Sequence, residues 1–192
     1  RSRRQRQMCI RDSYIYARET LGIGQTYNSQ VHHSATGSGT FEHLTAGPTT
    51  LLDPTGEGTV GSAVKDSAIV AAARAAGIPV ETVPQLVAIA GDSNSKAQTE
   101  AKTILRERAV VLGEAVSSLV GLFNPTRVVL GGQAFTDYPD TLNLIASLIH
   151  QNSTDVDIRV TAARERVQQQ AAAAVAITAV AYDPLHAVEG AR

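Results

Sequence analysis

The longest regular pattern of apolar and polar residues lies between Ser95 and Phe123. Apolar residues recur there at the three- and four-residue spacing of a one-sided helical stripe, which predicts one long amphipathic helix. The first half of this segment is charged and the second half is nearly all apolar. We therefore expect the C-terminal end of the helix to be more deeply buried than its charged first half.

A short strand and a glycine pair follow this helix. Pro125 lacks an amide N–H and disfavours a helical residue before it, so the helix should end at Asn124. Three consecutive apolar residues, Val128 to Leu130, predict a strand that is covered on both faces. Gly131 and Gly132 at its carboxyl end allow close approach by backbone or by a ligand, and both interpretations stay open.

The remaining elements fall into two groups. An antiparallel meander is expected first, with strands at 14–18, 25–27 and 31–35 and a hairpin turn at Asn28-Ser29. Helices are then predicted at 59–77, 83–90, 140–150 and 168–182, and a strand at 156–160. Because helices and strands alternate in the second half, we expect parallel strands with covering helices and an α/β fold.

Composition excludes several classes of protein. Hydrophobic residues make up 43% of the 192 residues and aromatic residues only 4%, so the core must be built from Ala, Val, Leu and Ile. Cys9 is the single cysteine, which rules out a disulfide framework or a cysteine-based zinc site within one chain. No apolar run approaches the ~20 residues of a membrane span. We expect a cytoplasmic protein with no membrane partner.

The charge is unevenly distributed. Residues 1–13 hold five arginines and one aspartate, and without them the chain has 12 basic and 17 acidic residues. That acidic body offers no general surface for nucleic acid. The basic arm can be interpreted as a phosphate-binding tail or as a non-native, adapter-derived tail, and we favour the second. Residues 14–192 then form one lobe, which begins inside a strand near Tyr14 and is expected to be the C-terminal part of a longer protein.

Four segments together resemble the C-terminal lobe of the ROK family of bacterial sugar kinases and sugar-responsive repressors. They are TLGIGQTYNSQVH, which is similar to a phosphate turn and hairpin; HSATGSGTFEHL, similar to a sugar-binding loop; LFNPTRVVLGG, similar to a strand beside the nucleotide; and RERVQQQAAAAVAITAVAYDPL, similar to a closing helix. The resemblance implies an actin-like ATPase (ribonuclease H-like) lobe. Within the family, the chain most resembles the regulators found in actinobacteria.

Departures from the kinase pattern bear on catalysis. Family kinases carry Gly-Thr-Gly-Ile-Gly at the phosphate turn, where this chain has Thr20, Leu21, Gly22, Ile23 and Gly24. A phosphate cradle needs free N–H groups without bulky side chains, and Leu21 serves it poorly. Gly22 and Gly24 can also be explained by the hairpin alone. The region of the family's catalytic aspartate would precede Tyr14. We therefore predict no catalytic residue, no enzyme activity and no cofactor, the alternative being ATP with Mg²⁺ in a kinase.

The sugar motif is shifted, and the metal motif is lost. The family's Glu-x-Gly-His falls on Thr40, Phe41, Glu42 and His43, so only the histidine is kept. Glu42 either points its carboxylate into the ligand pocket or is a solvated loop residue. The stretch similar to the family's zinc-binding CxCGxxGC segment, LLDPTGEGTVGSAVKD, has no cysteine. His43 with Asp53, Glu57 or His32-His33 is a poor ligand set, and we predict no metal.

These features predict the effector-sensing and dimerising part of a ROK family transcriptional repressor. Its candidate ligand-binding residues are Glu42, His43, Gly131 and Gly132. We expect a homodimer, a sugar or sugar-derived effector, and DNA binding only through a helix-turn-helix in the missing N-terminal region. The alternative is a ROK sugar kinase that transfers phosphate from ATP to a hexose. A third possibility is a dimerisation body that binds no ligand.

Overall fold

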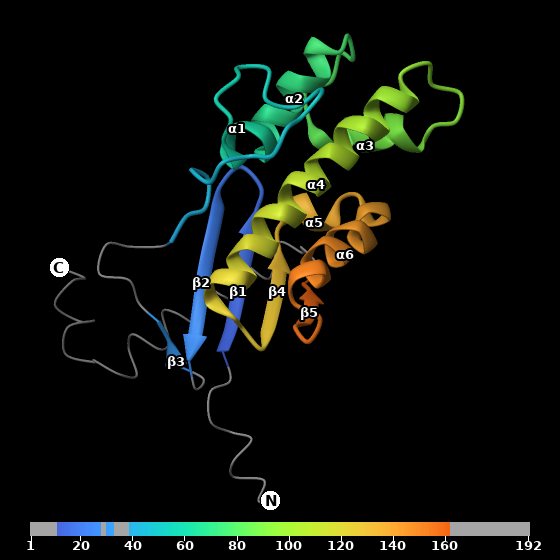
Figure 1. Cartoon of the computed structure of the whole chain (residues 1–192). Coiled ribbons are helices and arrows are strands. Elements are labelled where there is room, and N and C mark those ends of the chain that lie inside the picture. The colour runs from blue at the N-terminus through green and yellow to red at the C-terminus, as the bar shows by residue number, and fades with distance from the viewer. Residues whose placement is uncertain (1–10, 28–29, 33–38, 162–192) are drawn as a thin grey trace, which may run out of the picture. The chain divides into compact units, whose positions relative to one another are not determined.

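The computed structural model describes residues 11–27, 30–32 and 39–161, which contain one five-stranded sheet (Figure 1). The strands are β1 (Arg11–Ala17), β2 (Leu21–Tyr27), β3 (Gln30–Val31), β4 (Arg127–Gly131) and β5 (Asp157–Val160), in the spatial order β3-β2-β1-β4-β5. β1 to β3 pair antiparallel, whereas β4 runs parallel to both β1 and β5. The predicted α/β order of a meander followed by parallel strands is confirmed.

Six α-helices and the 3-10 helix η2 (Pro139–Thr141) accompany the sheet in this part of the chain. The α-helices are α1 (Val60–Val64), α2 (Asp66–Ala75), α3 (Val83–Gly91), α4 (Gln98–Phe123), α5 (Gln133–Thr136) and α6 (Leu142–Asn152). The long helix α4 crosses one face of the sheet and packs against α6, α3, α1 and α2 (Figure 1). Among the described residues, no helix combines the length and hydropathy that a membrane span requires.

The core lies between α4 and one face of the sheet. Ile15 and Ala17 of β1 and Val128 and Leu130 of β4 are buried, and they alternate with partly exposed residues such as Tyr14 and Val129. Successive side chains of a strand point to opposite faces, so the helices cover the odd positions of β1 and the even positions of β4. Val129 on the other face of β4 is half-buried, so the described residues cover the two faces of this strand to different degrees.

The predicted helix 59–77 is interrupted at Lys65. This residue has φ −57° and ψ 150°, which ends α1 and begins α2. Thr59 and Ser62 form a capping box at the start of α1, and Gly77 with φ +80° follows α2. The break is important for the site, because it places Lys65 between the two helices and Asp66 at the start of α2.

The long helix ends as predicted, and its last turn is exposed. Asn124 adopts a left-handed conformation with φ 45° before Pro125. The buried residues of α4 run from Ala101 to Val120, whereas Leu122 in the last turn is 74% exposed. More of the buried residues lie in the second half of α4 than in the first, as predicted, although Leu122 itself is exposed. Gly113 packs against α6, so α6 covers the middle of α4.

Several predictions concern residues outside the described ranges. These are the turn at Asn28-Ser29, residues 33–35 of the third strand, His33 and the closing helix at 168–182. β1 begins at Arg11, three residues before the predicted start, and pairs with β2 along its whole length.

Candidate functional site

The candidate ligand-binding residues gather at one end of the sheet, around the turn that joins β1 to β2. Gly132 lies against the backbone of Ala17, where β1 ends. Thr40 donates a hydrogen bond from Oγ1 to the carbonyl of Leu21, where β2 begins, over 2.7 Å. Ala17 and Leu21 are paired residues at the base of the turn. The turn thus separates two sides, which we call the strand-end side (residues 131–137) and the loop side (residues 40–43 with Lys65).

On the strand-end side, Gly132 is fixed by backbone geometry. Its φ is +97°, and a Cβ built there would collide with the carbonyl oxygen of Ala17 and lie 3.0 Å from the Ala17 nitrogen. A Cβ on Gly131 would lie 3.1 Å from Oγ1 of Thr161. Only glycine adopts such a conformation without strain. The close approach of β4 to β1 accounts for Gly132 without a ligand, and a ligand role for the pair stays a prediction.

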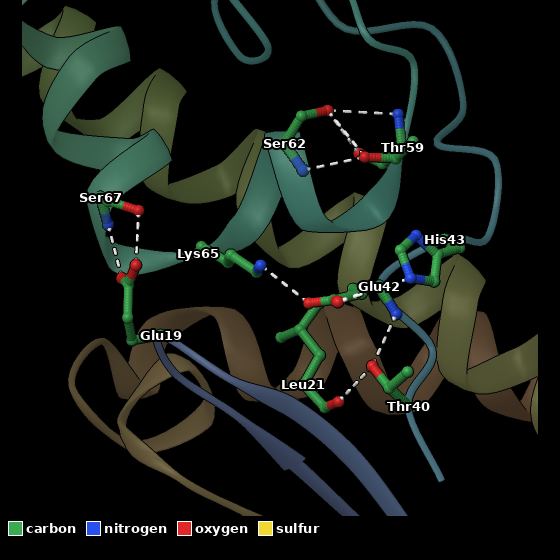
Figure 2. A network of polar contacts seen from close by, with 9 residues as sticks. All are labelled: Glu19, Leu21, Thr40, Glu42, His43, Thr59, Ser62, Lys65 and Ser67. Carbon is green, nitrogen blue, oxygen red and sulfur yellow. Dashed lines mark hydrogen bonds and ion pairs between the residues drawn. The ribbon is translucent and has the colours of Figure 1, made fainter.

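The loop side is a network of side chains (Figure 2). The Glu42 carboxylate accepts from Nζ of Lys65 at 2.7 Å and lies 3.5 Å from Nε2 of His43. Its backbone N–H donates to Oγ1 of Thr40 over 3.3 Å. The hydrogen bond and charge of Lys65 hold the pKa of Glu42 below its ordinary value. Glu42 is therefore neither a free pocket carboxylate nor a plain solvated residue, because its charge already has a partner.

His43 differs from its neighbour in exposure. Its side chain is 82% exposed, against 29% for that of Glu42. Both residues follow Thr40 in a loop whose backbone pairs with the start of α1, since Gly61 donates its N–H to the Glu42 carbonyl over 2.9 Å. The loop side thus offers an imidazole with two ring nitrogens to an incoming hydroxylated molecule, beside a carboxylate that Lys65 holds in place.

A buried arginine, which the sequence patterns did not single out, lies behind the turn. Arg108 of α4 is only 3% exposed. It donates from Nε to the Val64 carbonyl at 2.9 Å and from Nη2 to Oδ1 of Asp66 at 2.6 Å. Burial lowers the pKa of this guanidinium, and the Asp66 carboxylate opposes that effect. Arg108 lies three residues after Leu105 in the apolar stripe of α4, and a charge in such a stripe was the available signal for a buried ion pair.

The strand-end side also holds polar groups close to Arg108. Gln133, Asp137 and Tyr138 line a small cavity together with the arginine. Burial, with a smaller contribution from the Asp66 charge, raises the pKa of Asp137. Oε1 of Gln133 is buried without a hydrogen-bond partner among the described residues. This side is thus poorly suited to negative charge.

The stretch similar to the family's zinc segment is held by carboxylates. Asp53, with φ +56°, accepts from the N–H groups of Gly58 at 2.6 Å and Glu57 at 3.2 Å. Glu107 of α4 accepts from Leu51 N at 2.9 Å and from its two neighbours, Thr50 and Leu52. No three His, Cys, Asp or Glu side chains in the described part of the chain lie close enough together to hold a metal ion.

Comparisons with known proteins find similarity both to regulators and to kinases. No family model matches the chain. It is 38% identical over 189 residues to Transcriptional regulator Rv0485 of Mycobacterium tuberculosis and to Transcriptional regulator Mb0495 of Mycobacterium bovis, a match that covers 91% of this chain and 42% of each relative. The chain therefore spans less than half the length of the curated relatives it matches.

Solved structures identify the fold. A ROK family transcriptional regulator, a homologue of the E. coli MLC protein, superposes with a TM-score of 0.61 at 20% identity, over 79% of this chain and 41% of that one. The ROK hexokinase from Thermus thermophilus gives a TM-score of 0.66 at 21% identity, over 82% and 53%. At these identities the likeness shows the fold alone. The predicted actin-like lobe is confirmed.

Proposed function

We propose that this chain, which has the fold of ROK proteins and is homologous to mycobacterial transcriptional regulators, is the effector-sensing part of a ROK-type repressor. The observation that carries the proposal is the 38% identity over 91% of the chain to proteins named transcriptional regulators. The regulator superposes as well as several kinases do, so the fold alone does not favour either class.

The two sides of the turn support this proposal. On the loop side, Glu42 and His43 can accept and donate hydrogen bonds to the hydroxyl groups of a sugar. On the strand-end side, Gly131 and Gly132 serve to join β4 to β1. We propose that the chain needs no cofactor, since Leu21 stands where a phosphate cradle needs an unobstructed backbone.

The partners belong to the same proposal. DNA would be bound by a segment outside this chain, because the body of the chain is acidic and would repel phosphates. We propose a homodimer, as operators with twofold symmetry require, and a location in the bacterial cytoplasm, where transcription takes place.

A gel-shift experiment tests the proposal. The intact natural protein is mixed with the DNA upstream of its own gene, with and without a panel of unphosphorylated hexoses. We expect a retarded band whose intensity one sugar changes. Glu42→Gln should weaken the response to that sugar and leave the band without sugar unchanged. Glu100→Gln, an exposed position in the first turn of α4, is the matched control and should behave like the natural protein. Absence of any retarded band would contradict the regulator proposal.

A sugar kinase is the second candidate, and the shared fold with the Thermus thermophilus hexokinase favours it. An assay of ADP release by the intact protein, at saturating concentrations of hexose and ATP-Mg²⁺, would decide between the two. Sugar-dependent release of ADP would favour the kinase, because phosphoryl transfer depends on positioned groups around the nucleotide. A protein that binds DNA but gives no heat in calorimetry with sugars, sugar phosphates or nucleotides would favour the ligand-free dimerisation body.

A further inference from the structure

The turn between β1 and β2 is attached to the start of α2 by two successive contacts. Nε of Arg18 lies 3.4 Å from Oδ2 of Asp66. The carboxylate of Glu19 accepts from Oγ of Ser67 at 2.7 Å and from the Ser67 N–H at 3.0 Å (Figure 2). Two neighbouring turn residues thus pair with two neighbouring helix residues, although 48 positions separate the members of each pair.

Glu19 occupies a position that suits an anion. The first N–H groups of a helix have no partner within the helix, and the helix dipole favours negative charge at that end. α2 has ten residues, and Ser67 adds a hydroxyl donor beside its own N–H. Phosphate groups bind at such helix ends in many proteins. Here the chain's own carboxylate holds the donors, and its covalent tether gives it an advantage over any free anion.

The cations around the turn are already paired. Lys65 is bound to Glu42, and both Arg18 and Arg108 are bound to Asp66. Arg108 is also buried, so it cannot turn to an outside ligand. A phosphate that approached the start of α2 would have to displace the Glu19 carboxylate, and it would meet three cations that are balanced by the three carboxylates of Glu42, Asp66 and Glu19. Repulsion by the carboxylates would then oppose its binding.

We propose that Glu19 closes the β1–β2 turn to phosphate groups, whether these belong to a nucleotide or to a phosphorylated sugar. The closure follows from the contacts of Glu19 and does not require the chain to be a regulator. Its consequence for the effector, which would have to be an uncharged molecule rather than a sugar phosphate, rests on the proposed function.

Amide hydrogen exchange of the intact natural protein tests the closure, with inorganic phosphate as the probe. Phosphate should leave the exchange of the first turn of α2, Asp66 to Ala68, unchanged in the natural protein. In Glu19→Ala, the Ser67 amide of this turn should exchange about tenfold faster, because its charge-assisted hydrogen bond is lost. Added phosphate should then slow the exchange again, whereas chloride at the same ionic strength should not.

Two further variants keep the experiment decisive. Glu19→Gln retains an acceptor oxygen without the charge, so it should fold even where Glu19→Ala does not, and phosphate should slow its exchange more than in the natural protein. Glu81→Ala removes the same charge from an exposed position before α3 and should show no phosphate effect. Protection by phosphate in the natural protein, or no protection in either Glu19 variant, would overturn the proposal. Failure of the regulator proposal would appear in the gel shift and not in this measurement.

Discussion

The two sides of the β1–β2 turn are built on different principles. On the strand-end side, the backbone of Gly132 lies against that of Ala17, and the buried Arg108 lines a small cavity with Gln133 and Asp137. On the loop side, a half-buried ion pair between Glu42 and Lys65 holds the loop, and His43 is exposed. Backbone contacts leave almost no freedom to change residue types, whereas side-chain pairs can be rearranged. The comparison predicts that substitutions are tolerated on the loop side and destabilise the fold on the strand-end side.

The largest effect is expected from Gly132→Ala. The new Cβ would meet the Ala17 carbonyl, and φ +97° is a conformation that alanine rarely adopts. We expect a loss of about 4 kcal/mol in the free energy of unfolding, from backbone strain and overpacking together. Urea unfolding of the intact protein, followed by circular dichroism, measures it.

Gly121→Ala is the matched control for this substitution. Gly121 lies in the exposed last turn of α4, and a Cβ built there has nothing within 4 Å. Because alanine favours the helix over glycine, this variant should be more stable by up to ~1 kcal/mol. If both variants changed the stability equally, the strand-end side would not be fixed by the contact with Ala17.

The second effect concerns the pair that connects the two sides. Asp66→Ala removes the carboxylate partner of the buried Arg108 and leaves its charge uncompensated. We expect a loss of about 3 kcal/mol, as for other broken buried ion pairs. Asp155→Ala, at an exposed loop position, is the control and should change the stability by less than ~0.5 kcal/mol. If Asp66→Ala lowered the stability as little as Asp155→Ala does, solvent would have to reach and screen Arg108.

The sequence predicts the local parts of this arrangement and misses the long-range ones. The order of strands and helices, the stop at Asn124-Pro125 and the glycine pair at the end of β4 follow from local patterns, and the structure contains them. The break at Lys65 was missed because α1 and α2 together read as one continuous helical pattern. The Arg108–Asp66 contact joins residues 42 positions apart, which no spacing rule reveals.

The candidate site divides in the same way. Glu42 and His43 were found through their place in a motif, and Gly131 and Gly132 through strand-and-turn chemistry. Glu19 and Lys65 were missed, because an ordinary turn glutamate and a helix lysine are defined here only by the groups that they meet in space. Arg108 alone had a local signal, its position within the apolar stripe of α4.

A smaller effect, confined to the loop side, is expected from Lys65→Met. The substitution keeps most of the length of the side chain and removes the charge that holds Glu42. The melting temperature should change little, since partly exposed ion pairs contribute little to stability. The amides of Glu42 to Leu44 should nevertheless exchange faster, because the loop loses its contact with the junction of α1 and α2. An unchanged exchange rate there, in a variant with the same melting temperature, would show that Gly61 and Thr40 hold the loop without Lys65.

The smallest effects, and the sharpest contrast between the two sides, lie in the pH dependence. Lys65 lowers the pKa of Glu42. The ionised Glu42 therefore stabilises the folded protein fully above the ordinary glutamate pKa of about 4.3, and this stabilisation is lost as pH falls through the lower pKa of the folded protein. Burial raises the pKa of Asp137, so the folded state is favoured at low pH and loses stability as pH rises from about 3.9 through the raised pKa. Urea unfolding from about pH 3 to pH 7 should therefore show opposite trends. The advantage of the natural protein over Glu42→Gln should grow with pH, and its advantage over Asp137→Asn should shrink. Trends of the same sign would mean that both carboxyl groups lie in similar surroundings, which would remove the distinction between the loop side and the strand-end side.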